Sequence, residues 1–317
     1  MKFESYERTN GVPNIIVDGT ANAGTLLTLS HWRQSGTPQP LLADTSAEIV
    51  FKYLDSPQFH VDVSAVSNNH FDEDGLVGVF SLIDPEFASR YRGLLIDVAT
   101  AGDFGVVRDP LAARIVFILS AFADPERSPL PKPIFKRRYP DYAAALYEEL
   151  LKLLPDIVEK TGNYHSLWWN EDEQWRASED LCDSDDVTIT EKPELDLAIV
   201  RMPEGLARCH PFSIHSRTQS SRLIYLQGQR VEFQYRYESW VRLASYRPLL
   251  RADLDPLAEE LNREDDAGGK WKFDGVDHIS PRFSREGNSS ILDSKVVVSR
   301  IEEFLRTAPP AWDPYEP

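Results

Sequence analysis

The chain has 317 residues, with 51 Asp or Glu against 34 Lys or Arg, so its formal net charge is −17. Hydrophobic residues make up 42% and charged residues 27% of the sequence, which is typical of a soluble globular protein and excludes a disordered or collagen-like chain. No stretch approaches the roughly 18 apolar residues that cross a bilayer. The start of the chain, MKFESYERTN, lacks the apolar region of a secretory signal. We therefore expect a cytoplasmic protein without a membrane partner.

The acidic charge also limits the expected partners. Binding to long nucleic acid depends on Lys and Arg that release counterions from phosphates, so we expect a small phosphorylated substrate instead. Residues 171–196 carry 11 acidic and 2 basic residues, and residues 205–251 carry 8 Arg and 2 Glu. We interpret the first segment as a solvated acidic connector and the second as a region able to face anions. Cys182 and Cys209 are too few for a disulfide framework and are expected to be reduced. The oligomeric state is left open.

Three short apolar runs in the first part of the chain predict buried strands. They are residues 12–18 (VPNIIVD), 25–29 (TLLTL) and 61–66 (VDVSAV), and each runs into polar residues at its end. In an α/β sheet the ligand crevice lies at the carboxyl ends of the strands. These polar residues are therefore candidates for a binding site.

Amphipathic segments between and after these runs predict helices. Asp44 is placed to cap a helix that contains IVFKYL, and further helices are predicted at residues 76–83, 110–122 and 142–161. Strands that alternate with helices in this way predict a parallel sheet.

The later part of the chain has a different pattern. Residues 195–202 predict a strand. Residues 212–242 alternate apolar with polar residues, and Gly228 is predicted to lie at a hairpin turn. This pattern predicts a mostly antiparallel sheet, flanked by helices at 254–262 and 295–307.

The predicted fold class is thus α/β, with a parallel-sheet N-terminal domain and a smaller α+β C-terminal domain. The expected boundaries are an α/β domain at residues 1–170, an acidic connector at 171–196 and an α+β domain at 197–317.

The most specific local pattern is His70-x-Asp72-x-Asp74-Gly75 at a strand-to-helix junction. Carboxylates held this close repel each other, and a divalent cation resolves that repulsion. Imidazole combined with carboxylates suits manganese, iron or zinc, whereas mostly oxygen ligands suit magnesium or manganese. The alternative is a polar turn in which Asp72 or Asp74 caps the next helix.

Other candidate ligands follow the other strands. Asp18 ends the first strand and His31 follows the second, while Asp103 lies in the segment ATAGDFG. Each has a plain structural alternative: Asp18 and Asp103 as turn residues, and His31 as a buried histidine with satisfied hydrogen bonds.

These pieces resemble the motifs of the DHH phosphoesterase superfamily. The segment around His70 resembles its first metal-binding motif, and IIVDG resembles its second, a strand that ends in a bridging Asp. LTLSHW followed by LLADTSAEIVFKYL resembles the third motif, and ATAGDFG the fourth. The resemblance covers about 100 of the 317 residues, and the pieces occur in permuted order.

The resemblance implies a two-metal centre with two manganese or magnesium ions that hydrolyses a phosphoester or phosphoanhydride of a small nucleotide or short oligonucleotide. His70 and Asp72 would bind one ion, Asp74 and His31 the other, and Asp18 would bridge them. Asp103 would be a sixth ligand. No side chain is expected to act as the nucleophile.

Two departures from the family's pattern leave the activity open. Ser30-His31-Trp32 stands where the family has Asp-His-His, so His31 alone carries over. GGKW at residues 268–271 lacks the His of the family's Gly-Gly-Gly-His signature. The alternative hypothesis is therefore a catalytically inactive, DHH-like nucleotide-binding or regulatory protein.

Two further clusters are candidates for substrate binding. They share imidazole and guanidinium groups able to contact phosphate or carboxylate oxygens, and their residues are His210, His215, Arg217, His278 and Arg282. A third hypothesis is a hydrolase with one zinc at His210 and His215, and the plain alternative is a solvated surface.

Overall fold

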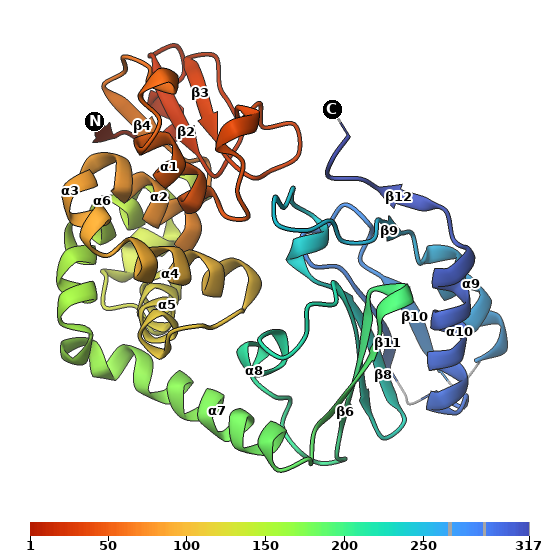
Figure 1. Ribbon diagram of the computed structural model, residues 1–317. Helices are drawn as coiled ribbons and strands as arrows, with labels where there is room; N and C mark the ends of the chain where they lie inside the picture. Colours follow the sequence, from red (N-terminus) through yellow and green to blue (C-terminus); the bar gives the residue numbers. More distant parts are fainter. Residues whose placement is uncertain (266–267, 288–289, 317) are drawn as a thin grey trace. The chain divides into compact units, whose positions relative to one another are not determined.

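The computed structural model describes residues 1–265, 268–287 and 290–316, which form two compact units (Figure 1). The N-terminal unit is Met1–Gln174 with Leu243–Ser245, and the C-terminal unit is Trp175–Arg242 with the described part of Tyr246–Pro317. In the described residues, no helix is both long and apolar enough to cross a bilayer.

The N-terminal unit contains a four-stranded sheet in which every pairing is parallel, as predicted. The strand order is β1-β4-β2-β3, and the strands are β1 (Lys2–Phe3), β4 (Ala65–Ser67), β2 (Asn14–Val17) and β3 (Thr25–Leu29). All residues of β2 and β4 are buried, as their apolar sequences require. The central strand β2 therefore has β4 on one side and β3 on the other.

Helices make up most of the remaining N-terminal unit (Figure 1). They are α1 (Ser46–Leu54), α2 (Glu73–Ile83), α3 (Pro85–Arg90), α4 (Arg92–Phe104), α5 (Pro110–Ala123), α6 (Tyr139–Glu159) and the first part of α7 (His165–Asp183), which continues into the C-terminal unit. Helices α1 and α2 contact the sheet and each other. Each of these two helices follows one of the strands that carry candidate ligands.

The ends of α1 and α2 differ from the prediction. Thr45, not Asp44, caps α1, because its hydroxyl accepts a hydrogen bond from the Glu48 N–H. The Asp44 carboxylate accepts instead from the N–H groups of Ala244 and Ser245. Helix α2 begins at Glu73, before the predicted start at residue 76, because the Asp72 carboxylate caps it.

Helices α3 and α4 were not predicted from the sequence. Helix α3 has only six residues, and α4 is only weakly amphipathic, so neither gives a clear periodic signal. The consequence matters for the site, because Asp103 lies in the last turn of α4 and not in a turn between elements. Helix α4 ends at Gly105, which has a positive φ of 67°.

The C-terminal unit is built on a six-stranded sheet with the order β10-β11-β8-β7-β6-β5. Its strands are β10 (Gly269–Phe273), β11 (Arg282–Gly287), β8 (Arg230–Tyr235), β7 (Arg222–Gln227), β6 (Leu197–Met202) and β5 (Thr188–Lys192). All pairings are antiparallel except that of β6 with β7. The predicted hairpin joins β7 and β8, with Gly228 at a φ of 58°.

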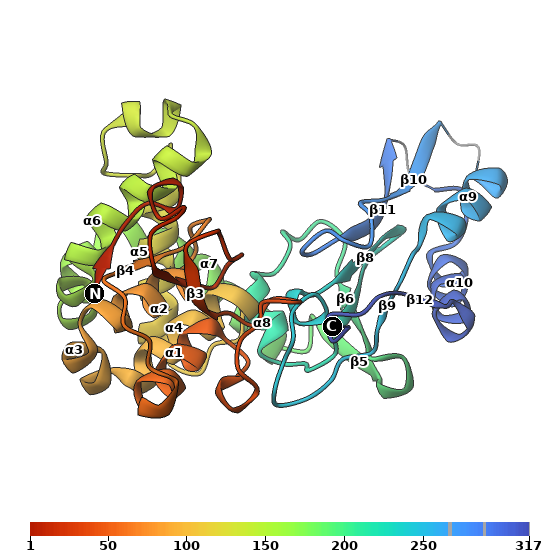
Figure 2. The same cartoon turned by 90° about the horizontal axis from the view of Figure 1, so that it is seen from above.

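Alternate residues of this sheet pack on opposite faces. Leu197 and Ile199 of β6 face a core with α9 (Asp255–Glu264) and α10 (Ser294–Thr307), which lie on the same side of the sheet (Figure 2). Ala198 and Val200 face the other side. The helices predicted at 254–262 and 295–307 correspond to α9 and α10. The remaining strands, β9 (Arg251–Ala252) and β12 (Pro310–Trp312), form a separate pair.

Two segments predicted from charge or alternation adopt other structures. The acidic segment 171–196, predicted to be a solvated connector, contains the end of α7 and the strand β5, which pairs residue by residue with β6. The start of the alternating region 212–242 is helical: α8 (Pro211–His215) begins at a proline, and the ring of His210 caps it. A pattern of apolar residues as short as that of α8 fits a helix as well as a strand, so the sequence alone did not identify this helix.

Asp265 joins three elements of the C-terminal unit. Its carboxylate accepts hydrogen bonds from Arg285 Nε at 2.8 Å, Trp271 Nε1 at 3.2 Å and Ser290 Oγ at 2.6 Å. The side chains of Asp265 and Arg285 are 0% and 5% exposed, so the pair is buried. Burial alone would raise the pKa of Asp265, but the hydrogen bonds from Ser290 and Arg285 outweigh it and lower the pKa to about 2.

Asp265→Ala is expected to reduce the free energy of unfolding by about 3–5 kcal/mol, because it removes the buried carboxylate that pairs with the Arg285 guanidinium. Urea unfolding followed by tryptophan fluorescence measures this change. Since the pKa of about 2 lies below that of an unfolded Asp, the stabilisation is complete above roughly pH 4 and is lost as the pH falls towards 2. The control is Glu286→Ala, which breaks an exposed pair with Lys272 and should cost less than about 1 kcal/mol. Equal costs would contradict a buried-charge role for Asp265.

Candidate metal centre

Three neighbouring strands deliver the candidate ligands to one edge of the N-terminal sheet. Asp18 directly follows β2, His31 follows β3 after one residue, and His70 follows β4 by three residues. Because these strands are parallel and adjacent in the order β4-β2-β3, their carboxyl ends meet at this edge. Asp18 comes from the middle strand and so lies between the two histidines.

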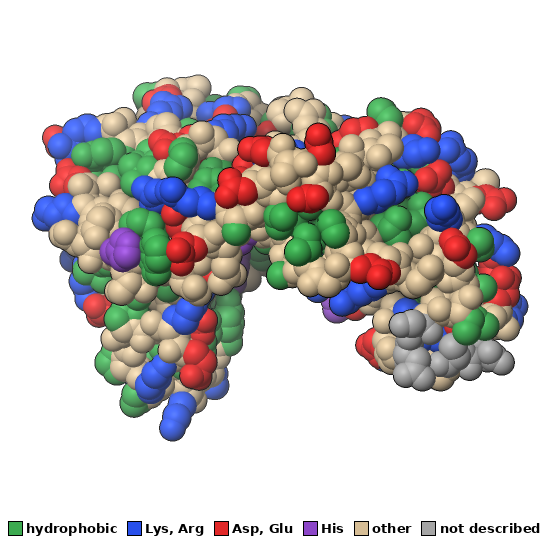
Figure 3. All heavy atoms as spheres, turned by 90° about the horizontal axis from the view of Figure 1, so that it is seen from below, with side chains coloured by type: hydrophobic (Ala, Val, Ile, Leu, Met, Phe, Trp, Pro, Cys, Tyr) green, Lys and Arg blue, Asp and Glu red, His purple; other side chains and the backbone are tan. Residues whose placement is uncertain are grey.

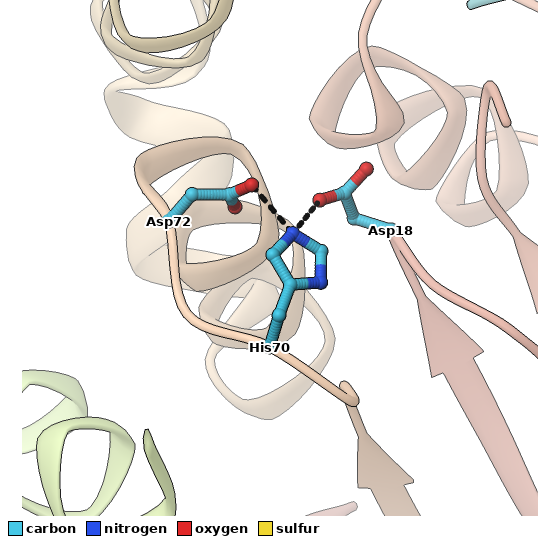
Figure 4. Close-up of side chains that lie close together, drawn as sticks. All are labelled: Asp18, His70 and Asp72. Carbon is cyan, nitrogen blue, oxygen red and sulfur yellow. Dashed lines mark hydrogen bonds and ion pairs between the residues drawn. The ribbon is translucent and has the colours of Figure 1, made fainter. Parts of the chain in front are cut away.

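The first group of side chains is Asp18, His70 and Asp72 (Figure 4). His70 Nε2 lies 2.6 Å from Asp72 Oδ2 and 3.3 Å from Asp18 Oδ2. Figure 4 shows both carboxylates pointing toward the same ring nitrogen. The side chains of His70 and Asp72 are 21% and 27% exposed, whereas that of Asp18 is completely buried. This group is therefore the part of the cluster that solvent reaches.

The second group is Asp18, His31 and Asp74, and all three side chains are fully buried. His31 Nε2 lies 3.4 Å from Asp18 Oδ1 and 3.9 Å from Asp74 Oδ2. Asp18 thus offers one oxygen to each histidine. The two groups share this one carboxylate.

Asp103 adds a further carboxylate to the second group. Its Oδ2 lies 3.6 Å from His31 Nε2, although the residue comes from α4 and not from the predicted turn. Asp103 Oδ2 and Asp18 Oδ2 are buried and have no hydrogen-bond partner in the described part of the chain. Buried carboxylate oxygens without donors are costly unless a cation or a proton neutralises them.

Helix α1 fixes the orientation of the buried ligands. The Ser46 hydroxyl donates to Asp18 Oδ1 at 2.7 Å, and the N–H groups of Ser46 and Ala47 donate to the two oxygens of Asp74 at 2.7 Å each. Asp74 therefore also binds the amino end of α1, where a carboxylate is favoured by the helix dipole. A helix-capping role for Asp74 is compatible with a role as a metal ligand, because each carboxylate oxygen has a second lone pair.

His31 is oriented by its backbone contact. Its Nδ1 lies 2.6 Å from the carbonyl oxygen of Asp44, which can only accept, so Nδ1 carries the proton. In a neutral ring, Nε2 is then an acceptor that faces the oxygens of Asp18, Asp74 and Asp103. This arrangement of acceptors requires a proton or a cation between them, and a carbonyl on the far nitrogen is typical of metal-binding histidines.

The pattern His70-x-Asp72-x-Asp74-Gly75 ends in a glycine because position 75 has no room for a side chain. A Cβ at this position would lie 2.2 Å from Asn68 Nδ2 and 2.6 Å from the Tyr147 hydroxyl. The loop before α2 therefore folds closely over the start of the helix. Asn68 Nδ2 and Tyr147 Oη are buried and lack hydrogen-bond partners among the described residues.

The histidines are drawn toward the protonated form by the carboxylates. Burial alone would lower the pKa of His70, but the charge of Asp72 and hydrogen bonds with Asp18 and Asp72 outweigh it and raise the pKa to about 11. The pKa of His31 is also raised, because its contacts with Asp18 outweigh burial. The nearby imidazoles of both histidines lower the pKa of Asp18 below its usual range, against the effect of burial.

The other acids of the cluster are drawn toward the neutral form. Burial and repulsion from Asp18 raise the pKa of Asp74 to about 7, and burial and repulsion from Asp74 raise that of Asp103 well above its usual range. Burial raises the pKa of Glu73 to about 7, although Ser120 donates a hydrogen bond to it at 2.8 Å. The metal-free cluster thus retains protons that offset its excess of acidic groups, and divalent cations are able to replace them.

Three residues around the cluster were not among the sequence candidates: Ser46, Glu73 and Asn68. Ser46 lies in the segment DTSAE that the DHH resemblance included, so the sequence indicated the segment but not the contact with Asp18. Glu73 lies between Asp72 and Asp74 in the sequence, and no periodic signal marks it as half-buried. Asn68 follows directly after β4, where polar residues were expected to face the crevice.

The candidate substrate contacts lie in the C-terminal unit and have local partners. His210 Nδ1 accepts from the Phe212 N–H, and Arg217 pairs with Glu179 and Asp183. His215 is half-buried. His278 and Arg282 are exposed, and Arg282 Nε lies 3.8 Å from a Glu232 oxygen. Their role in binding substrate stays a prediction.

Among the described residues, no third metal ligand accompanies His210 and His215 at the alternative zinc site. In the described residues, groups of three or more His, Cys, Asp or Glu side chains with ligand atoms close enough for a metal occur only around Asp18. One ring nitrogen of His210 is also occupied by the cap of α8. The geometry therefore favours the N-terminal cluster as the metal centre.

The chain belongs to the family of unknown function designated DUF6687, whose model matches residues 1–316. No curated protein and no solved structure matches the chain significantly. The resemblance to the DHH superfamily therefore rests on the motif residues alone.

His70→Ala is expected to weaken manganese binding by at least roughly 10-fold, because it removes an imidazole from a group of three ligands. His210→Ala, which removes an imidazole from the C-terminal unit, should leave manganese binding unchanged. Calorimetric titration of both variants with Mn²⁺, together with metal analysis after dialysis, measures this difference. Loss of the metal in His210→Ala and retention in His70→Ala would contradict the N-terminal centre.

Proposed function

We propose that this member of the DUF6687 family is a metal-dependent hydrolase of phosphoesters or phosphoanhydrides that acts on a small nucleotide or short oligonucleotide. The observation that carries the proposal is the position of Asp18. One carboxylate faces His70 with Asp72 on one side and His31 with Asp74 on the other. A shared carboxylate between two ligand groups is the arrangement that a two-metal centre requires.

The residues present fit manganese or magnesium. His70, Asp72 and Asp18 would hold one ion, and His31, Asp74 and Asp18 the other, with Asp103 as a further ligand to the second. The donor set combines imidazole with several carboxylates, which suits manganese best. When bound, such ions supply charge neutralisation for a phosphate and Lewis-acid activation of water.

The chain itself orients the ligand side chains and leaves the cluster accessible from the side of His70 and Asp72. The Ser46 hydroxyl fixes Asp18, and the Asp44 carbonyl fixes His31. The positions of these two ligands therefore do not depend on bound ions. The second group is fully buried, whereas His70 and Asp72 are partly exposed. A phosphate therefore approaches from the side of His70, where the Trp32 ring stacks on the imidazole with its centroid 5.0 Å away.

Ser30 and Trp32 favour the second candidate, a catalytically inactive nucleotide-binding or regulatory protein. Ser30 is completely buried, and its hydroxyl accepts from the Trp32 N–H. Neither residue supplies the carboxylate or second imidazole of the Asp-His-His pattern. This candidate predicts nucleotide binding without turnover.

Hydrolysis of bis(p-nitrophenyl) phosphate with and without Mn²⁺ tests the proposal. We expect metal-dependent turnover, and we expect Asp18→Asn to lower kcat/KM by roughly 100-fold because both ligand groups lose their shared carboxylate. The matched control is Asp62→Asn, since Asp62 is exposed and precedes β4 at the opposite edge of the sheet. It should retain full activity.

The two candidates differ in the result with natural substrates. A panel of mononucleotides, dinucleotides and short oligonucleotides would be tested for turnover, and calorimetry would measure their binding. Absence of metal-dependent turnover with every compound would contradict the hydrolase. Binding without turnover would support the regulatory protein.

A further inference from the structure

One segment of the N-terminal unit is strongly basic in an otherwise acidic chain. Residues 127–140 contain five Lys or Arg and no Asp or Glu, whereas the whole chain has a net charge of −17. The segment includes the 3₁₀ turn Lys132–Lys136 and leads into α6. In Figure 2, this part of the chain is yellow-green and forms a projection of the N-terminal unit. Figure 3 shows the same projection at the lower left, where lysine and arginine side chains gather together with some acidic ones.

The segment is bound directly to the loop that carries the metal ligands. The Tyr139 hydroxyl accepts a hydrogen bond from the Phe71 N–H at 3.2 Å. Phe71 is the residue between His70 and Asp72, which form the exposed side of the cluster. The end of the basic segment therefore lies next to the side from which a substrate approaches.

Two of the five cations have no side-chain partner among the residues that the structure describes. Arg127 pairs with Asp124 and Glu171, Arg138 pairs with Glu7 and Asp141, and Lys132 donates to backbone carbonyls; these contacts hold the segment in place. The side chains of Lys136 and Arg137 are exposed and have no hydrogen bond or ion pair in the part of the chain that the structure describes. They are available to an anion.

Aromatic residues flank these two cations in the sequence, at Phe135 and Tyr139. Tyr139 is 48% exposed, and its ring contacts Tyr142 edge-on with the centroids 5.3 Å apart. Phe135 contacts the same Tyr142 ring at 5.7 Å. Cations interspersed with exposed aromatic rings are typical of surfaces that bind single-stranded nucleic acid, where the bases stack and the phosphates pair.

The spacing favours a chain of phosphates over a single one. Lys136 and Arg137 lie three and two residues before Tyr139, which corresponds to at most about 11 and 7 Å of extended backbone. Both cations therefore lie within about 11 Å of Tyr139 along the backbone. Phosphates next to the one that is cleaved at the metal cluster are their expected partners.

We propose that Lys136, Arg137 and the ring of Tyr139 bind the phosphates and a base of a short single-stranded oligonucleotide whose scissile phosphate lies at the metal cluster. This inference rests on the proposed function and assigns its substrate class. The segment is short and the rest of the chain is acidic, which limits the bound strand to a few nucleotides.

Binding of 5′-fluorescein-labelled pentathymidylate to the full chain in EDTA, followed by fluorescence anisotropy, tests the inference without turnover. The double variant Lys136→Ala with Arg137→Ala should weaken binding roughly 10-fold at low salt, and it should reduce the slope of log Kd against log salt by roughly 1.4, the loss of two phosphate contacts. Equal affinity and slope in the variant and the wild type would overturn the inference.

The matched control is Arg90→Ala with Lys152→Ala, which removes the same charges from exposed positions. Arg90 lies beyond the far end of α2, and Lys152 lies about 20 Å along α6 from Tyr139. This variant should bind pentathymidylate as the wild type does. An equal loss in both double variants would show a nonspecific effect of charge and would overturn the inference.

Tyr139→Leu separates an oligonucleotide from a simple polyanion. It should weaken pentathymidylate binding a few-fold and leave the binding of inorganic polyphosphate, measured by competition, unchanged. If polyphosphate competes as well as the oligonucleotide and Tyr139→Leu binds both normally, the segment recognises only negative charge, and the oligonucleotide assignment is wrong.

Kinetics distinguish failure of this inference from failure of the proposed function. Bis(p-nitrophenyl) phosphate has no second phosphate, so the Lys136→Ala and Arg137→Ala double variant should hydrolyse it as the wild type does, with a lower kcat/KM on pentathymidylate. Unchanged kcat/KM on both substrates would overturn the inference and leave the hydrolase intact. No turnover of either by the wild type would contradict the hydrolase itself.

Discussion

The N-terminal unit depends on one buried carboxylate at the end of its central strand. Asp18 is fully buried at a φ of 48°, and it faces two imidazoles that come from the strands on either side. Burial of an acidic group is unfavourable unless neighbouring charges compensate for it. Ser46 and the two histidines provide this compensation, and the same contacts set the distances at which divalent cations fit.

The sequence allowed this convergence to be predicted because strand ends are easy to recognise. The runs before Asp18, His31 and His70 are short and apolar, and parallel strands place their carboxyl ends together whatever their order in the chain. The permuted order of the DHH-like pieces therefore does not prevent their residues from meeting.

Other features were not predictable because they depend on contacts distant in the sequence. Asp44 looked like a cap but binds the Ala244 and Ser245 backbone, about 200 residues away. The acidic segment after residue 171 has the composition of a connector, yet pairing with β6 makes part of it a strand. Helix α4, which carries Asp103, has too weak an apolar periodicity to identify. Local patterns predict strand ends well and long-range partners poorly.

The most direct test of this account is an anomalous difference map from crystals soaked in Mn²⁺. The account predicts two peaks about 3.5–4 Å apart, one among Asp18, His70 and Asp72 and the other among Asp18, His31 and Asp74. No peak at this edge of the sheet, or strong peaks elsewhere with Asp18 bound to no ion, would contradict the central claim.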